Sequence, residues 1–201
     1  MYLTGLEAML SSFNDNIFLP HTPPHDTQGD LGWWKQRLSR PKLARPIPEP
    51  RSPVDYDAYS DASSGFRVAI TIGPRWWAWR LAAGWKSQGR DIQWAKAVGF
   101  ELLVICLCAL SSKGEHIQVY GDNRGVVEGW WKKSSANKPT NRIFRRILQL
   151  SESCDRSIYT KYIPSAQNPA DAPSRGQYPP PELLLGHVTV PEEVRPFLID
   201  V

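Results

Sequence analysis

Residues 58–65 have the sequence AYSDASSG, which indicates the end of a β-strand that carries Asp61 and runs directly into a tight turn. Two further runs, 66–72 and 76–81, are rich in β-branched and aromatic residues and are separated by a second short turn. Together with a first strand over 54–61, these runs predict an antiparallel meander of three strands. Asp61 is then expected at the end of the first strand.

A long helix over residues 92–111 is predicted after the meander, with Asp91 as its N-cap. One face of this helix is formed by residues at i, i+3 and i+4 spacing, namely Ala97, Val98, Glu101, Ile105 and Cys108. The pattern places Glu101 on the buried stripe, where an unpaired carboxylate is costly. The alternative is a surface glutamate at the border of this stripe.

Residues 116–120 form the next predicted strand, which ends at Asp122. A strand–helix–strand connection brings this strand back parallel to the first one, so Asp61 and Asp122 are expected at the same edge of the sheet. Two helices and a fifth strand are expected further on, over residues 124–133, 140–153 and 156–163. The predicted fold is therefore α/β, with a five-stranded mixed sheet of three antiparallel and then two parallel strands, flanked by helices.

Prolines mark both ends of the chain. Of the 18 prolines, eight lie before residue 54 and five after residue 178. This distribution predicts Pro-rich arms over 1–53 and 177–201 around a core domain over 54–176. In the first arm, residues 20–29 are expected to be a loop, followed by a short helix that Asp30 caps. The apolar residues of both arms predict that the arms pack on the core.

The net charge of +4 decides little, but the basic residues are clustered. Between residues 130 and 146 there is no acid and there are six basic residues, Lys132, Lys133, Lys138, Arg142, Arg145 and Arg146. A basic block beside an acidic site suits a polyanion. A solvated helix face is the alternative interpretation.

The three cysteines show no disulfide framework, which favours a reducing compartment. Residues 1–13 lack the basic start and the long apolar stretch of a secretion signal. The apolar run over 102–110 is too short to cross a bilayer. We therefore expect an intracellular protein, cytoplasmic or nuclear, that is not secreted and has no membrane partner.

A fourth acidic residue, Asp171, lies in the segment NPADAPSR over residues 168–175. Carboxylates brought close together repel one another, and divalent cations are the usual compensation. The order Asp61, Glu101, Asp122 and Asp171 across strand, helix, strand and loop resembles the ribonuclease H family. The sequences around Asp61 and Asp171 resemble those of the ribonuclease H domains of retroelement reverse transcriptases, from fungal, DIRS-like or related elements. In such an element, residues 1–53 would be a connection-like arm.

This resemblance implies endonucleolytic hydrolysis of the RNA strand in RNA–DNA hybrids by two Mg²⁺ ions, with Mn²⁺ able to substitute. Asp61 would bridge both ions, Glu101 and Asp122 would complete one site, and Asp171 the other. The implied partners are the hybrid itself and a reverse transcriptase polymerase domain of the parent element. The residues expected to bind nucleic acid are Ser63, Asn123, Trp131, Lys132, Lys133, Lys138, Asn141, Arg145, Arg146 and Arg175.

The sequence departs from the family pattern in two places. The stretch before Asp171, residues 164–168, contains no histidine, and Pro173 replaces the usual leucine. A domain that binds nucleic acid or protein without cleavage is therefore one alternative. A transposase- or integrase-like nuclease is another, although those enzymes place their glutamate after the second aspartate, whereas Glu101 precedes Asp122.

Overall fold

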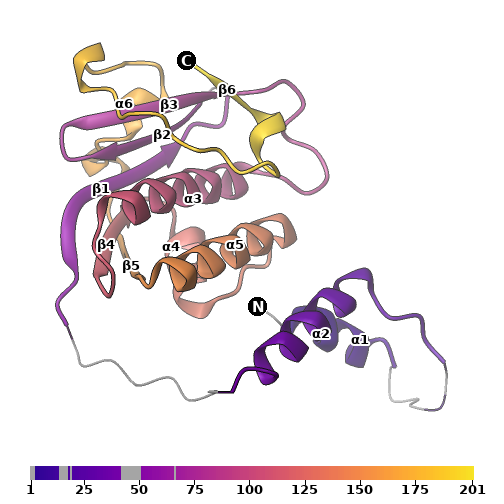
Figure 1. Ribbon diagram of the computed structural model, residues 1–201. Coiled ribbons are helices and arrows are strands. Elements are labelled where there is room, and N and C mark those ends of the chain that lie inside the picture. Colours follow the sequence, from indigo (N-terminus) through magenta and orange to yellow (C-terminus); the bar gives the residue numbers. More distant parts are fainter. Residues whose placement is uncertain (1–2, 14–17, 19, 42–50, 66) are drawn as a thin grey trace. The chain divides into compact units, whose positions relative to one another are not determined.

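The computed structural model describes residues 3–13, 18, 20–41, 51–65 and 67–201, which form two compact units, 1–50 and 51–201 (Figure 1). The first unit contains helices α1 (Thr4–Ser11) and α2 (His25–Leu38). Their contact is close at Gly5, where an added Cβ would lie 2.7 Å from the backbone of Asp26. Glycine is therefore required at this crossing.

The prediction that Asp30 caps a helix is wrong, because α2 begins five residues earlier, at His25. Asp30 lies inside α2, fully buried, and its Oδ2 accepts a hydrogen bond of 2.8 Å from the backbone N–H of Gly5. Asp30 therefore binds the backbone of α1, whereas it was expected to cap its own helix. Trp33 and Trp34 pack edge to face, 4.9 Å between ring centroids, and their burial against the core stays a prediction.

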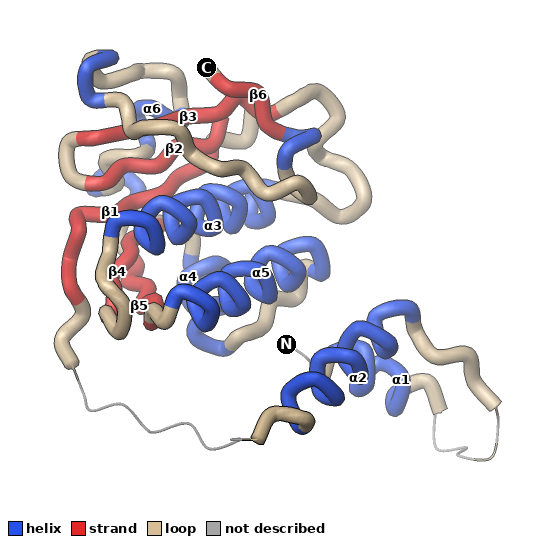
Figure 2. The backbone as a smooth tube through the Cα atoms, in the orientation of Figure 1, coloured by secondary structure: helices blue, strands red, loops and turns tan. Residues whose placement is uncertain are grey.

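The second unit is built on a mixed sheet in the order β5-β4-β1-β2-β3-β6 (Figure 2). Its strands are β1 (Val54–Ala62), β2 (Arg67–Ile72), β3 (Arg75–Leu81), β4 (His116–Gly121), β5 (Ser157–Tyr162) and β6 (Leu198–Asp200). The antiparallel β1–β2–β3 meander and the parallel β1–β4–β5 pairing confirm the predicted arrangement. The predicted number of five strands is wrong, because the C-terminal segment adds β6 antiparallel to β3 and covers that edge.

The helices of this unit are α3 (Ile92–Leu110), α4 (Arg124–Lys132), α5 (Lys138–Cys154) and the short α6 (Asp171–Ser174), with 3₁₀ turns at Ser165–Gln167, Pro181–Leu183 and Arg195–Phe197. Asp91 caps α3 as predicted, accepting from the N–H of Trp94 at 2.9 Å. Helix α3 packs on β1 and β2, and α5 packs on α3. An 18-residue stretch of α3 has a mean hydropathy of 1.7, which would suit a membrane span by composition alone. However, 61% of this stretch is buried within the fold.

One residue of α3, Gly99, sets how closely the helix approaches the sheet. A Cβ added there would lie 3.1 Å from Cγ1 of Val68 and 3.5 Å from the carbonyl oxygen of Asp61. The absence of a side chain lets α3 lie against the end of β1. Polar side chains near the start of α3 can therefore reach this end of the sheet.

The C-terminal segment packs on the core, as predicted for this arm. Trp76 stacks on Tyr178 with 4.9 Å between centroids and donates to the carbonyl oxygen of Pro180 at 3.1 Å. The segment also buries apolar side chains, namely Leu185, Val188, Val190 and Val194. Leu184 and Ile199, expected to be covered as well, are 38% and 41% exposed, because they lie where the segment runs along the surface.

Candidate functional site

Asp61 and Asp122 lie at one edge of the sheet, as the strand pattern predicted. Strands β1 and β4 run parallel, and Ser60 is the register partner of Gly121. The next residue on each strand is an aspartate, so both carboxylates leave the sheet at the same level. Asp61 is 3% exposed.

A residue that the sequence pattern did not single out, Lys96 of α3, joins these two aspartates. Its Nζ atom lies 2.8 Å from Oδ1 of Asp61 and 2.6 Å from Oδ1 of Asp122. The Lys96 side chain is 17% exposed. The sequence signal for Lys96 is a lysine between two alanines in a mostly apolar helix, since a half-buried ammonium requires carboxylate partners.

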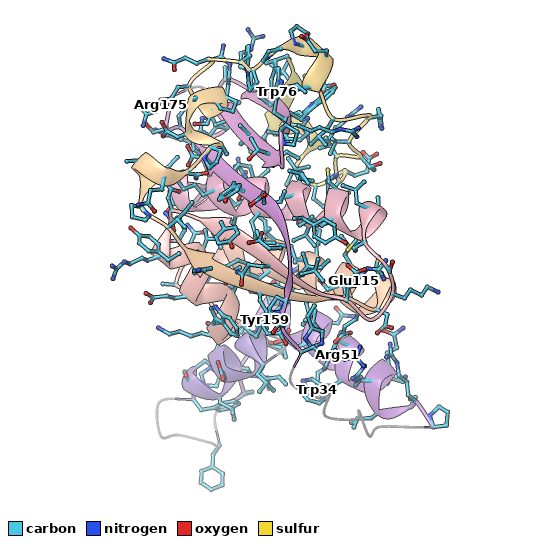
Figure 3. All side chains as sticks on the ribbon, turned by 90° about the vertical axis from the view of Figure 1, so that its left-hand side faces the viewer. Trp34, Arg51, Trp76, Glu115, Tyr159 and Arg175 are labelled. Carbon is cyan, nitrogen blue, oxygen red and sulfur yellow. The ribbon has the colours of Figure 1, made fainter. Side chains whose placement is uncertain are left out.

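Helix α6 brings Asp171 to the same edge. The Oγ of Ser174 lies 2.7 Å from Oδ2 of Asp61 and 2.8 Å from the carbonyl oxygen of Asp171. The backbone here is fixed by Ser63, whose Oγ donates to the carbonyl oxygen of Ser174 at 2.8 Å. Arg175, at the end of the unit where Trp76 also lies (Figure 3), donates from Nε to Oδ2 of Asp171 at 2.9 Å.

The second oxygen of Asp122 is also occupied, because Ser165 donates a hydrogen bond to its Oδ2. Asn168 ties the intervening loop to the strand by donating from Nδ2 to the carbonyl oxygen of Ser60 at 3.1 Å. Residues 165–175 therefore deliver three polar partners, Ser165, Ser174 and Arg175, to the aspartates. Pro173 is accommodated within the single turn of α6.

The charges of this cluster support one another. Burial raises the pKa of Asp61, and the contacts with Lys96 and Ser174 oppose this rise without cancelling it. For Asp122 burial acts in the same direction, but the hydrogen bonds from Lys96 and Ser165 outweigh it and hold the pKa below its usual value. Burial lowers the pKa of Lys96, but Asp122 and Asp61 outweigh this effect, so the ammonium form is stabilised.

Glu101 does not join this cluster, which corrects its expected place beside Asp61 and Asp122. It is 2% exposed, and its two oxygens accept hydrogen bonds of 2.6 Å from Nε and Nη2 of Arg146 on α5. Five helical residues correspond to a rotation of about 140°, so Glu101 and Lys96 leave α3 in different directions. The stripe correctly indicated burial for Glu101, but the buried partner is an arginine.

The residues present do not fit the pair of Mg²⁺ ions that the resemblance implies. Within the described part of the chain, no three His, Cys, Asp or Glu side chains converge so as to hold a metal ion. Asp61 and Asp122 share the ammonium of Lys96, and Asp171 pairs with Arg175. Mg²⁺ binds proteins through one or two carboxylates and keeps several waters, but the carboxylate oxygens of Asp61 and Asp122 already face Lys96, Ser174 and Ser165.

Several of the residues expected to bind nucleic acid have partners within the chain. Asn123 caps α4 by accepting from Val126 at 3.0 Å, and both ends of the Asn141 amide bond the backbone of Ser135. Arg146 forms an ion pair with Glu101, and the Ser63 hydroxyl donates a hydrogen bond to the carbonyl oxygen of Ser174.

The remaining basic residues differ in accessibility. Lys138 is exposed, and Lys132 is exposed beside Glu128 at 3.8 Å. Lys133 folds its ammonium over the ring of Trp130, 3.4 Å from the centroid, and Arg145 is half-buried. Trp130 is buried in the core, whereas Trp131 is 55% exposed.

Comparisons with known proteins give no match to a protein-family model and none to a curated protein. Two solved structures are similar to part of the chain. One is RNase H1 from Halobacterium salinarum NRC-1, with 19% identity over 63% of this chain and 97% of that chain and a TM-score of 0.44. The other is the N-terminal RNase H domain of a Mycobacterium tuberculosis protein, with 17% identity over 60% and 88% and a TM-score of 0.41.

Proposed function

We propose that residues 51–201 form a ribonuclease H-like domain that binds RNA–DNA hybrid across the sheet edge at Asp61, Asp122 and Asp171. The observation that carries this proposal is the convergence of these three aspartates, which are far apart in sequence, with Lys96 and Arg175. Three carboxylates alone would repel a phosphate backbone. Two cationic groups remove most of that repulsion, so a polyanion can approach.

Exposed groups around this edge support binding to a nucleic acid. Arg124 lies over the ring of Tyr162, 4.9 Å from its centroid, and both residues are exposed. Further along the same unit, Trp131 exposes 55% of its surface, with Nε1 fixed to the carbonyl oxygen of Thr160 at 3.0 Å. A fixed, exposed indole is a stacking surface for a base or a sugar.

The binding is tested by fluorescence anisotropy with a labelled hybrid, with DNA and RNA duplexes of the same sequence as comparators and EDTA present throughout. The hybrid is expected to bind more tightly than duplex DNA, because recognition by shape and 2′-hydroxyls requires an RNA strand. Equal affinity for all three would show general polyanion binding. No binding to any of them at low salt would overturn the proposal.

The contribution of the basic block over residues 130–146 to binding is tested by a triple alanine variant of its exposed residues, Lys132, Lys138 and Arg142. For each phosphate that the variant no longer neutralises, the slope of log affinity against log salt should fall by about 1. The matched control removes three exposed basic residues elsewhere, Arg75, Arg80 and Lys113, and should leave the slope unchanged. Equal slopes in both variants would assign the basic block to solvation alone.

Metal-dependent hydrolysis of the RNA strand, the activity that the resemblance implies, is the alternative, and the pairing of Lys96 with Asp61 and Asp122 stands against it. The chain would then be a hydrolase that acts on RNA–DNA hybrids, as the resemblance implies. Hydrolysis would require Lys96 to leave Asp61 and Asp122. Cleavage by the natural chain that is abolished in Asp61→Asn would support this candidate over binding alone.

A further inference from the structure

We infer that the ammonium of Lys96 replaces a divalent cation between Asp61 and Asp122, so that this chain assembles its carboxylate edge without metal. The inference rests on the proposed function only in treating the edge at Asp61 and Asp122 as the nucleic-acid site. It names a residue, Lys96, that decides whether the edge can take up Mg²⁺ or Mn²⁺.

The position of Nζ is the first argument. One oxygen of each aspartate faces this single atom, at 2.8 Å for Asp61 and 2.6 Å for Asp122. A metal cation that binds one oxygen from each of two carboxylates lies at the same position, between the two oxygens. Among the residues that the structure describes, Oδ1 of Asp61 accepts no aligned hydrogen bond, so its contact is the charge of Lys96 at 2.8 Å.

The remaining oxygens are the second argument. Oδ2 of Asp61 accepts from Ser174, and Oδ2 of Asp122 accepts from Ser165. All four carboxylate oxygens therefore face a protein group. A metal ion could bind only by displacing the ammonium, whose tether on α3 fixes it beside the sheet through the close contact at Gly99.

Charge gives the third argument. The two carboxylates require about one positive charge at the point between them to offset their repulsion. Lys96 supplies this charge as part of the chain, without a bound ion. Replacing Lys96 by glutamate would place a third carboxylate at this point, and a divalent cation could then offset the repulsion of the three.

The test is thermal unfolding of the full-length chain with Mn²⁺ or Mg²⁺ as the only added ligand, compared with EDTA. The natural chain should change its unfolding midpoint by less than about 1 °C. The Lys96→Glu variant should unfold earlier in EDTA and recover by at least about 5 °C in Mn²⁺. Lys113→Glu, an exposed lysine in the turn before β4, is the charge-matched control and should behave as the natural chain does.

Adding Asp122→Asn to Lys96→Glu should remove most of the Mn²⁺ response, since it removes a ligand. If Lys96→Glu does not fold in EDTA, Lys96→Gln takes its place, because it frees the carboxylates without adding a charge and should also respond to Mn²⁺. A natural chain that responds to Mn²⁺ as strongly as the variants would overturn the inference, as would folded variants without any response. Neither result depends on hybrid binding, which is measured separately in EDTA.

Discussion

The Nζ atom of Lys96 lies 2.6 Å from Oδ1 of Asp122, and this ion pair joins the start of α3 to the end of β4. The same ammonium lies 2.8 Å from Asp61 at the end of β1. A single lysine thus connects the central helix to two parallel strands. Its charge has consequences for stability that can be separated from any role in binding.

Lys96→Met is expected to destabilise the fold by about 3 kcal/mol, because it leaves the carboxylates of Asp61 and Asp122 facing each other without a counter-charge. Chemical denaturation at neutral pH measures this decrease. Adding Asp122→Asn should restore part of the stability, which a double-mutant cycle would report as a favourable coupling. Strictly additive effects would show that the ion pair does not stabilise the fold.

Glu101→Gln is expected to cost about 3 kcal/mol as well, since Arg146 would keep a half-buried guanidinium without its carboxylate partner. Its affinity for hybrid, measured in EDTA, should stay within about twofold of that of the natural chain. Asp91→Ala, which removes the cap of α3, serves as a control for general destabilisation, at about 1 kcal/mol. A specific decrease in hybrid binding in Glu101→Gln would return Glu101 to the functional site.

Lys133 predicts a dependence of stability on pH. Burial lowers the pKa of Lys133 from its ordinary value of 10.5 to about 8. Between these two values the unfolded chain binds more protons than the folded chain, so the free energy of unfolding should rise as the pH rises from 8 to 10.5. The ammonium lies over the ring of Trp130, and this contact favours the charged form and reduces the rise.

Denaturation across this pH range should show a smaller rise in Lys133→Gln than in the natural chain. Lys113→Gln is the exposed control and should keep the full rise. The same pH profile in both variants would mean that Lys133 titrates as a solvated lysine.

Removal of residues 177–201 is expected to destabilise the second unit by on the order of 6 kcal/mol or more, since Leu185, Val188, Val190 and Val194 lose their burial and β3 loses its partner strand. Limited proteolysis and urea denaturation measure the effect. Rapid trimming at residue 176 without a decrease in stability would show that the segment is not part of the fold.

The fold was largely predictable because its signals are local. The strand that ends at Asp61, the cap at Asp91 and the strand that ends at Asp122 each depend on residues that are neighbours in sequence. The meeting of Asp61 and Asp122 followed from the direction of two strands. Strand β6 is not predictable from local sequence, because its partner, β3, lies more than a hundred residues earlier in the chain.

The centre of the site was less predictable. Helical periodicity identified Glu101 as buried but did not reveal which element it faces, and its partner on α5 is 45 residues away. Lys96 lies outside the apolar stripe, so helical periodicity does not mark it. Its function depends on two aspartates from different strands, which is a long-range relationship that no local pattern contains.

We propose that this edge of the sheet binds a nucleic acid without a metal ion. One experiment tests it most directly: a hybrid with a labelled RNA strand is incubated with the natural chain in EDTA and in Mg²⁺, and both binding and strand length are followed. We expect equal binding in the two conditions and an intact RNA strand. Cleavage in Mg²⁺ that disappears in Asp61→Asn, or binding that requires Mg²⁺, would contradict it.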